Sequence, residues 1–235
     1  MSKKLPVVLV LTICVMAAGS VVGQKQLKPW KEWSKEDAQK ILNNSPWAHL
    51  QVDQDFLEAS PLTRPPDASV DTRLRQNEGM TYGIRIFSAR PVRQAFVRMI
   101  QLQKKDLPPE TMARLNSFAE ATSDDSIIIA VTIENPDANL LGKAMQVVRN
   151  ATAVRIRNNT YLESNDGRRV FLEEYTPPGS DGFGARFIFP RMVDGKPFLN
   201  PDLSTLRFVA NLGGSVEMNM TYKVKDMMLD GKLEY

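Results

Sequence analysis

Hydrophobic and polar residues between positions 80 and 150 follow the spacing of strands and helices in turn. Around Ile84, apolar residues alternate with polar ones, which predicts a half-buried strand. Apolar residues three or four positions apart then predict three amphipathic helices. The apolar faces of these helices contain Val92, Phe96, Met99 and Ile100; Met112, Leu115, Phe118 and Ala119; and Leu140, Leu141, Ala144, Val147 and Val148.

The first of these helices is expected to begin near Pro91, because proline suits the first helical turn. Ser88, just upstream, is the candidate for its N-cap. The polar side of the helix is expected to face water with Arg93, Arg98 and Lys104.

Residues 127–133 read Ile-Ile-Ile-Ala-Val-Thr-Ile and therefore have no polar face. A short run that is apolar on both sides is typical of a central strand that is covered on both faces. We expect the side chains at alternate positions to lie in the interior of the protein: Ile127, Ile129, Val131 and Ile133.

The last third of the chain consists of short alternating segments, which predict strands near residues 153–162, 168–175, 184–189, 205–212 and 215–225. Asn165-Asp166-Gly167 and Gly213-Gly214 have the composition of turns between such strands. Helices early and antiparallel strands late indicate an α+β protein. The predicted architecture is a mixed sheet with an early helical layer and a late run of antiparallel strands.

The N-terminus has the three-part pattern of a secretory signal peptide. Lys3 and Lys4 precede an apolar stretch over residues 5–18, and small residues follow it. Cleavage is expected after Gly23, with Gly19 as the alternative site. The alternative of an uncleaved anchor is disfavoured, because a spanning helix needs about 20 apolar residues and this stretch is shorter.

Composition divides the chain into four parts: a signal peptide over 1–23, a Trp-rich N-terminal segment with a short helix over 24–50, a polar Pro-containing connection over 51–79, and an α+β body over 80–235. Ser34 as N-cap with Asp37 at the third helical position predicts the short helix, which extends to about Asn43.

All three tryptophans, Trp30, Trp33 and Trp47, lie in the N-terminal segment. Two interpretations remain open: the indoles complete the core of their own domain, or they form an interaction surface, since tryptophan is enriched at interface hot spots. We expect the segment to dock on the body with at least one indole partly exposed.

Removal of residues 1–23 leaves 212 of the 235 residues, with 28 basic and 27 acidic side chains. This near balance argues against a nucleic-acid partner. The only cysteine, Cys14, leaves with the signal, so disulfides and thiolate chemistry are excluded from the mature chain. We expect a protein exported to the periplasm or the outside, which meets a membrane only through the uncleaved signal segment.

Catalytic and metal-binding patterns are weak, and we predict no catalytic, cofactor or metal site. His49 is the only histidine and is expected to be structural. Glu173 and Glu174 are neighbours on a predicted strand and therefore point to opposite faces. Asp124-Asp125 is expected in a turn. One histidine and no mature cysteine leave little for zinc or copper.

The glycine-rich stretch over residues 177–184 resembles a phosphate-binding loop only in composition, because it lies between two strand-like segments. We expect it to be a strand connection. Arg155 and Arg157 alternate with Val154 and Ile156, so a strand with a solvated arginine row is expected there. These two arginines are the candidate contacts for an anionic ligand.

Three segments carry a resemblance: Trp30-x-x-Trp33-Ser34, Ser45-Pro46-Trp47-Ala48, and the ending from Asp226 to Leu233. They are similar to segments of a family of uncharacterised exported bacterial proteins. The resemblance implies a bacterial source and export, and it implies no activity.

The function expected from these features is that of a non-enzymatic binding protein of the cell envelope, with an envelope protein or polymer as its partner. Two alternatives remain: a hydrolase with a dispersed site that has no motif, and a carrier of a small apolar or anionic ligand. The oligomeric state is not determined by these patterns.

Overall fold

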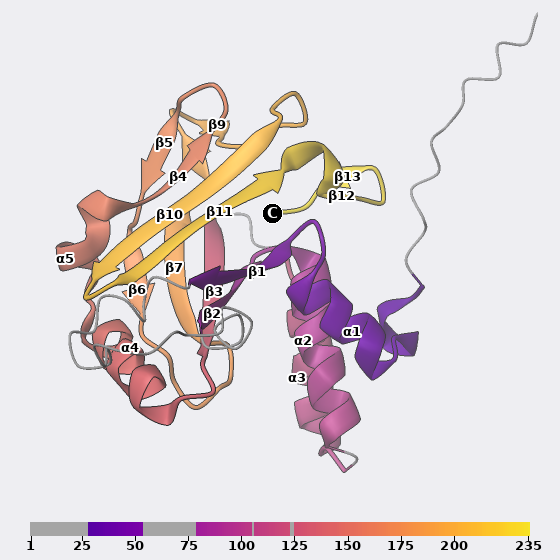
Figure 1. Cartoon of the computed structure of the whole chain (residues 1–235). Coiled ribbons are helices and arrows are strands. Elements are labelled where there is room, and N and C mark those ends of the chain that lie inside the picture. The colour runs from indigo at the N-terminus through magenta and orange to yellow at the C-terminus, as the bar shows by residue number, and fades with distance from the viewer. Residues whose placement is uncertain (1–27, 54–78, 105, 123–124) are drawn as a thin grey trace, which may run out of the picture.

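The computed structural model describes residues 28–53, 79–104, 106–122 and 125–235 (Figure 1). The helices are η1 (Trp30–Glu32), α1 (Lys35–Asn43), α2 (Arg90–Gln103), α3 (Pro109–Glu120), α4 (Ala138–Asn150), α5 (Ala153–Ile156), η4 (Arg157–Asn159) and η5 (Val224–Asp226). The longer strands are β1 (Ala48–Asp53), β2 (Met80–Ile86), β3 (Ser126–Glu134), β4 (Thr160–Ser164), β5 (Arg169–Phe171), β6 (Glu174–Thr176), β7 (Ala185–Pro190), β10 (Thr205–Gly213) and β11 (Val216–Lys223). Two small hairpins are formed by β8 (Met192–Val193) with β9 (Lys196–Pro197) and by β12 (Met228–Leu229) with β13 (Lys232–Leu233).

The α+β class predicted from the sequence is confirmed. The strands form a five-stranded sheet in the order β1-β2-β3-β7-β6 and a four-stranded sheet in the order β11-β10-β4-β5. All pairings between these strands are antiparallel. The sheet component is therefore two antiparallel sheets that pack face to face, with β10 and β11 crossing over β3 and β7 (Figure 1).

The chain passes from one sheet to the other between two adjacent residues. The backbone N–H of Leu172 donates to Thr160 and extends the pairing with β4, whereas the N–H of Glu173 donates to Ile188 and begins the pairing with β7. The strand predicted near residues 168–175 is therefore two strands in different sheets. Local alternation could not reveal this crossing, because it depends on which partner strand lies beside each residue.

A side chain joins the two sheets at their other edges. The amide of Gln51 in β1 donates from Nε2 to the carbonyl of Glu217 at 2.9 Å and accepts at Oε1 from the N–H of Asn219 at 2.8 Å. Gln51 bonds to the backbone of β11 as a residue of a neighbouring strand would. The edges of β1 and β11 therefore cover one another, which disfavours pairing of either edge with another chain. The two sheets are thus connected by the Gln51 side chain at one pair of edges and by the chain crossing at Leu172–Glu173 at the other.

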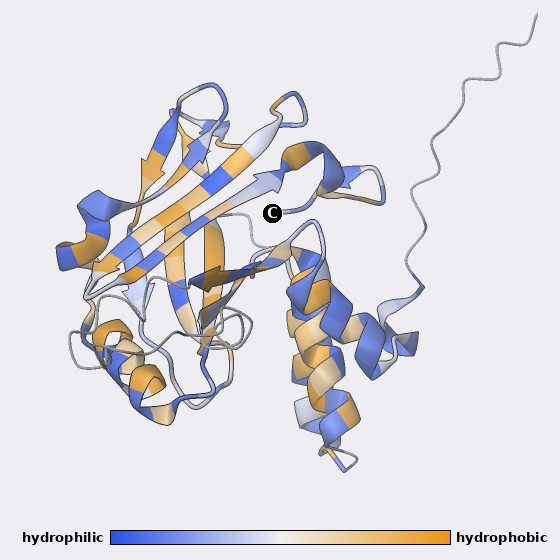
Figure 2. Cartoon of the chain, viewed as in Figure 1, coloured by the Kyte–Doolittle hydropathy of each residue, from blue (hydrophilic) through white to orange (hydrophobic). Residues whose placement is uncertain are grey.

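Apolar side chains fill the space between the sheets. Hydrophobic and polar residues alternate along β10 and β11 (Figure 2), and every second residue over most of these two strands is buried. Phe187 from β7 and Phe208 from β10 meet there with ring centroids 5.4 Å apart. The hydroxyl of Tyr222 donates to the carbonyl of Ile84 across the interface at 3.1 Å.

β3 is the middle strand of the five-stranded sheet, as the apolar run over residues 127–133 predicts. Ile127, Ile129 and Val131 are buried on the face that meets the other sheet, whereas Ile133 near the strand end is half-buried. The opposite face of the strand is also covered in part, since Ala130 is fully buried. The prediction of an interior strand is confirmed.

The short N-terminal helix is confirmed as α1, with a complete capping box between Ser34 and Asp37. The N-cap predicted for α2 is wrong: Ala89 occupies that position, and the Ser88 hydroxyl instead accepts from the N–H of Ile128. Ser88 lies beside β3 after folding, so its hydroxyl serves the neighbouring strand rather than its own helix.

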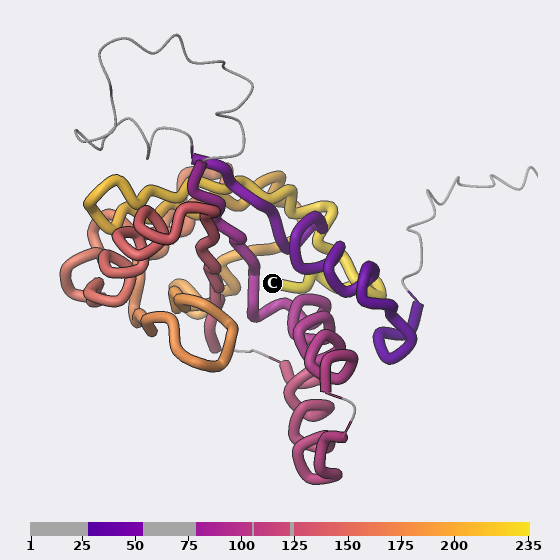
Figure 3. Tube along the Cα trace, turned by 60° about the horizontal axis from the view of Figure 1, so that its bottom comes forward, coloured from indigo at the N-terminus to yellow at the C-terminus, as the bar shows by residue number. Residues whose placement is uncertain are grey.

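Helices α2 and α3 pack against one another and extend away from the sheets (Figure 3). Four phenylalanine rings lie where this helical pair meets the sheet, with centroids 4.9–6.0 Å apart. Phe87 follows β2, Phe96 and Phe118 come from α2 and α3, and Phe183 comes from the glycine-rich loop. Within the described ranges no helix is both long and apolar enough to span a membrane.

The Trp-rich segment and the body share one hydrophobic core. Of the predicted connection over 51–79, residues 51–53 belong to β1 and residue 79 precedes β2, while 54–78 lie outside the described residues. The predicted signal peptide over 1–23 lies outside them as well. The glycine-rich stretch connects β6 to β7, antiparallel neighbours, as expected for a strand connection.

Candidate functional site

The three tryptophans are buried, with exposed fractions of 7 % for Trp30, 3 % for Trp33 and 3 % for Trp47. The expectation that at least one indole is partly exposed is therefore wrong. Each indole N–H also has an acceptor inside the protein: Glu120 for Trp30, the carbonyl of Lys28 for Trp33, and the carbonyl of Glu234 for Trp47. The indoles complete the core, and no tryptophan surface is available to a partner.

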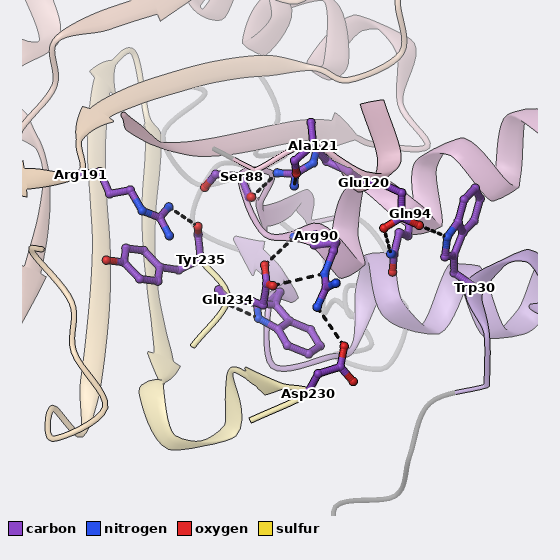
Figure 4. Close-up of polar contacts among 12 residues, drawn as sticks. Trp30, Ser88, Arg90, Gln94, Glu120, Ala121, Arg191, Asp230, Glu234 and Tyr235 are labelled. Carbon is purple, nitrogen blue, oxygen red and sulfur yellow. Dashed lines mark hydrogen bonds and ion pairs between the residues drawn. The ribbon is translucent and has the colours of Figure 1, made fainter. Parts of the chain in front are cut away.

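Arg90 and Arg191 hold the C-terminal tail in place (Figure 4). Arg90 at the start of α2 contacts the carboxylates of Asp230 at 3.0 Å and Glu234 at 3.3 Å. Arg191 donates to the carbonyl of Tyr235, and its guanidinium lies 3.7 Å from the centre of the Tyr235 ring. These contacts join the tail, α2 and the end of β7, so we assign the cluster a structural role.

Two buried arginines bind the C-terminal ends of helices. Arg85 in β2 donates from Nε to the carbonyl of Leu42 at 2.6 Å, and Arg93 in α2 donates to the carbonyl of Ala121. Carbonyls in the last helical turn lack partners within the helix and attract cations. Burial lowers the pKa of both guanidinium groups. Arg93 was expected to face water, and that prediction is wrong because the end of α3 covers it.

His49 lies in β1 with its ring centroid 5.3 Å from that of Tyr222. Partial burial lowers the pKa of the imidazole, so burial favours its neutral form. No hydrogen bond joins its side chain to a serine hydroxyl among the described residues. Its neighbours give it a packing role between the two sheet edges.

The structure describes both members of only one of the two carboxylate pairs. Glu173 immediately precedes β6, Glu174 begins it, and both are exposed. Asp125 is exposed and its backbone carbonyl accepts from the N–H of Arg191, while Asp124 lies outside the described residues. Across the described ranges, no group of three His, Cys, Asp or Glu side chains is placed to hold a metal ion.

Arg155 and Arg157 do not form a row on a strand, which corrects the prediction. Arg155 lies in α5, a single helical turn, and Arg157 begins η4. In this turn Ile156 is buried and Val154 is 90 % exposed, so only one of the two apolar residues contacts the core. The alternation at 154–157 reflected one turn of helix rather than two strand faces.

A surface pocket of about 530 Å³ lies beside Arg155, and Arg157 is not part of its wall. The pocket is formed where α4, α5, η4 and the β10–β11 turn meet. We refer to it as the amide–arginine pocket. Its walls are Gln146, Val147, Asn150, Ala151, Arg155, Ile156, Asn159, Asn211, Leu212, Gly213 and Gly214.

Four carboxamide side chains line this pocket, and the structure holds one of them in place. Asn211 donates from Nδ2 to the carboxylate of Glu217 at 2.5 Å and accepts at Oδ1 from the N–H of Gly213 at 2.9 Å. The first bond connects β10 to β11, and the second lies within β10 at the start of the β10–β11 turn. The turn itself requires glycine, since Gly213 and Gly214 have φ angles of 82° and 58°.

The other polar side chains of the pocket have no partner within the described part of the chain. Gln146, Asn150 and Asn159 make no side-chain hydrogen bond there, and Arg155 makes neither a side-chain hydrogen bond nor an ion pair. Gln146 and Asn150 are four residues apart on α4 and therefore lie on one face of the helix. Val147, Ile156 and Leu212 supply apolar surface between them.

A second feature is the outer face of the four-stranded sheet, which no described helix covers in Figure 1. Tyr161 is paired with Phe171 and with Val209, so the three side chains share that face. Phe171 is 43 % exposed. The Arg169 guanidinium lies 4.7 Å from the Tyr161 ring centre and 2.6 Å from the Glu163 carboxylate. We refer to this area as the aromatic sheet face.

Sequence reasoning proposed Arg155 but missed the carboxamides around it. Gln146 and Asn150 share a helical spacing of four residues on α4, but Asn159 in η4 and Asn211 in β10 share no motif or spacing with them. The sequence has no signal for the four as a set, because only folding brings the three elements together. Comparisons of this chain with protein-family models, curated proteins and solved structures find no match.

Proposed function

We propose that this protein is an exported, non-enzymatic binding protein that holds a small anionic ligand in the amide–arginine pocket. The observation that carries the proposal is the exposed guanidinium of Arg155 beside three exposed carboxamides at an open surface pocket of about 530 Å³, none of them with a partner among the described residues. Pockets that hold small ligands typically measure about 300–1,000 Å³ and contain a few convergent polar groups.

The charge of the pocket wall supports an anion. Arg155 is the one ionisable residue among the wall residues, and its fork of N–H donors suits carboxylate or phosphate oxygens. Glu217, which contacts the wall through Asn211, already accepts a hydrogen bond from that amide. A ligand with negative charge therefore meets one cation and no wall carboxylate.

The chemistry of the wall supports binding rather than catalysis. The wall residues are carboxamides, aliphatic side chains, glycines and one arginine, and none of them is a nucleophile. General acid–base catalysis needs a group whose pKa lies near the operating pH, and an arginine keeps its proton in proteins. The signal-peptide pattern supports the exported location.

Titration calorimetry on the mature chain tests this proposal, with phosphate, citrate and glucuronate as probes. We expect at least one of these anions to bind, and we expect Arg155→Gln to weaken that binding at least tenfold. Arg157→Gln is the matched control, since Arg157 is a neighbouring exposed arginine outside the pocket wall. Equal loss in both variants, or no binding of any probe, would contradict the proposal.

The aromatic sheet face supports a second candidate function, docking to a protein of the cell envelope. Tyrosine, phenylalanine and arginine are enriched in protein–protein interfaces. The polar side chains of this face are held in place before binding: Arg207 donates to Asn219 at 2.8 Å and lies 3.5 Å from Glu163. A partner would therefore lose little side-chain entropy on this side of the contact.

Photo-crosslinking in the producing cell tests the second candidate. A crosslinking residue at position 171 should give one discrete adduct, which should disappear when Arg207 is changed to alanine. The control position is 154, which is highly exposed but lies outside the face. Adducts of the same pattern at both positions would argue against a specific docking surface.

A further inference from the structure

The amide–arginine pocket is larger than a single small anion requires. An isolated phosphate or carboxylate bound to Arg155 would leave most of the roughly 530 Å³ to water. The three unpartnered carboxamides would then also remain bonded only to water. A ligand that uses the whole wall must combine one anionic group with a larger polar body.

The carboxamides specify the polar body. Each carboxamide offers two N–H donors and one acceptor oxygen, so it can both donate to and accept from a hydroxyl group. Gln146 and Asn150, one helical turn apart on α4, present two such groups side by side. Neighbouring hydroxyls on a sugar ring match this arrangement, because each hydroxyl is also a donor and an acceptor.

The apolar part of the wall is consistent with the same ligand. Val147, Ile156 and Leu212 provide aliphatic surface between the amides. A pyranose ring has C–H groups on its faces and hydroxyls at its edge, so it can place its faces against aliphatic side chains and its edge against amides. A compact polyanion has no such apolar face.

We propose that the ligand of this pocket is an acidic saccharide, with the carboxylate of a uronic acid held by Arg155 and its hydroxyls held by Gln146, Asn150 and Asn159. This inference rests on the proposed function and names the ligand class for the same pocket. Asn211 can form fewer hydrogen bonds to the ligand, because its amide is already bonded to Glu217 and Gly213. It retains one N–H for a hydroxyl oxygen of the ligand.

Titration calorimetry with charged and neutral forms of one saccharide provides the test. The probes are an α-linked galacturonate trisaccharide, its fully methyl-esterified form, and a β-linked glucuronate–N-acetylglucosamine disaccharide. We expect at least one of the two acids to bind. If it is the trisaccharide, the methyl ester should bind at least tenfold more weakly, since the ester removes the charge and keeps the ring hydroxyls.

The variants separate the two parts of the site. Arg155→Gln should lower the affinity for the acid at least tenfold and leave that for the ester unchanged, and Arg155→Lys should restore only part of the loss. Asn150→Ala should lower the affinity for the acid and the affinity for the ester by a similar factor. Arg157→Gln should change neither. Melting temperatures of all four variants check that the fold is intact.

The outcomes distinguish this inference from the proposed function. If citrate or phosphate binds in an Arg155-dependent way and neither acidic saccharide binds, the saccharide inference is overturned and the anion pocket stands. If acid and ester bind equally well, the carboxylate assignment is overturned. If no anion depends on Arg155, both proposals fail.

Discussion

At Gly83 in β2, a missing side chain makes room for the guanidinium of Arg85. A Cβ added at Gly83 would lie 2.7 Å from Nη2 of Arg85 and 2.7 Å from the hydroxyl of Thr132. Arg85 uses that space to reach the carbonyl of Leu42 and the side chain of Asn43, at the end of α1. A glycine and an arginine two residues apart on the same strand face therefore attach a helix to the sheet.

Gly83→Ala should displace the Arg85 guanidinium and lower the free energy of unfolding by about 1–3 kcal/mol, the usual loss when a buried polar group loses partners. Urea unfolding measures the change. Gly142→Ala is the control: this exposed helical glycine has no atom within 4 Å of an added Cβ, so its free energy of unfolding should rise, by up to about 1 kcal/mol. Equal effects at both glycines would refute the packing argument.

His49 gives a pH dependence with a definite sign. Partial burial lowers the pKa of its imidazole in the folded protein, whereas in the unfolded chain this pKa is about 6.5. Below that pH the unfolded state binds more protons than the folded state, so stability is fully present above about pH 6.5 and falls on acidification. His49→Gln should lose less stability than the wild type between pH 7 and pH 5, as measured by melting temperature. If the melting temperatures of His49→Gln and the wild type fall by the same amount, His49 is not the source of the pH dependence.

At the scale of elements, the same alternating pattern leads to different structures depending on what lies beside it. In β11, Val216 and Met218 are buried because β10 and the opposite sheet cover one face. At residues 154–156 the pattern is equally regular, yet only Ile156 meets the core, and the segment folds as a helical turn. A strand needs a neighbour for its backbone groups, and these residues are not paired in either sheet.

The central position of β3 predicts a large effect of truncation in its interior. Ile129→Ala removes buried methyl groups and leaves a cavity, which should lower the free energy of unfolding by about 2–5 kcal/mol. Val154→Ala is the control, because its highly exposed side chain should contribute less than about 0.5 kcal/mol. Denaturant unfolding compares the two variants. An unchanged midpoint for Ile129→Ala would place β3 outside the core.

At the scale of the whole molecule, the Trp-rich segment and the C-terminal tail contact one another. Trp47 follows α1, and its indole N–H donates to the carbonyl of Glu234 near the C-terminus at 2.9 Å. Tyr235 reaches further and donates from its hydroxyl to the carbonyl of Leu199 at 3.2 Å. The Trp-rich segment, the body and the C-terminal tail therefore share one hydrophobic core.

Deletion of residues 228–235 should lower the melting temperature and expose Trp47. The wild-type protein should show blue-shifted tryptophan fluorescence that iodide quenches weakly, because all three indoles are buried. The deletion should shift the emission to longer wavelength and increase quenching. Phe171→Ser on the outer face of the four-stranded sheet is the control and should leave both properties unchanged. Quenching in the wild type as strong as in the deletion would contradict the burial of the indoles.

The sequence by itself determines several features of this protein. They are the class of the fold, the capping box at Ser34, the interior position of residues 127–133 and the turns near Asn165 and Gly213. Each of them depends on residues that are close along the chain, such as a cap and its partner three positions later. The tertiary structure decided three other features. They are the position of the crossing between Leu172 and Glu173, the burial of the three indoles and of Arg93, and the proximity of Arg155 to three carboxamides. These features join residues from separate elements, and the pairing that brings them together is set by the burial of the whole core rather than by any local pattern.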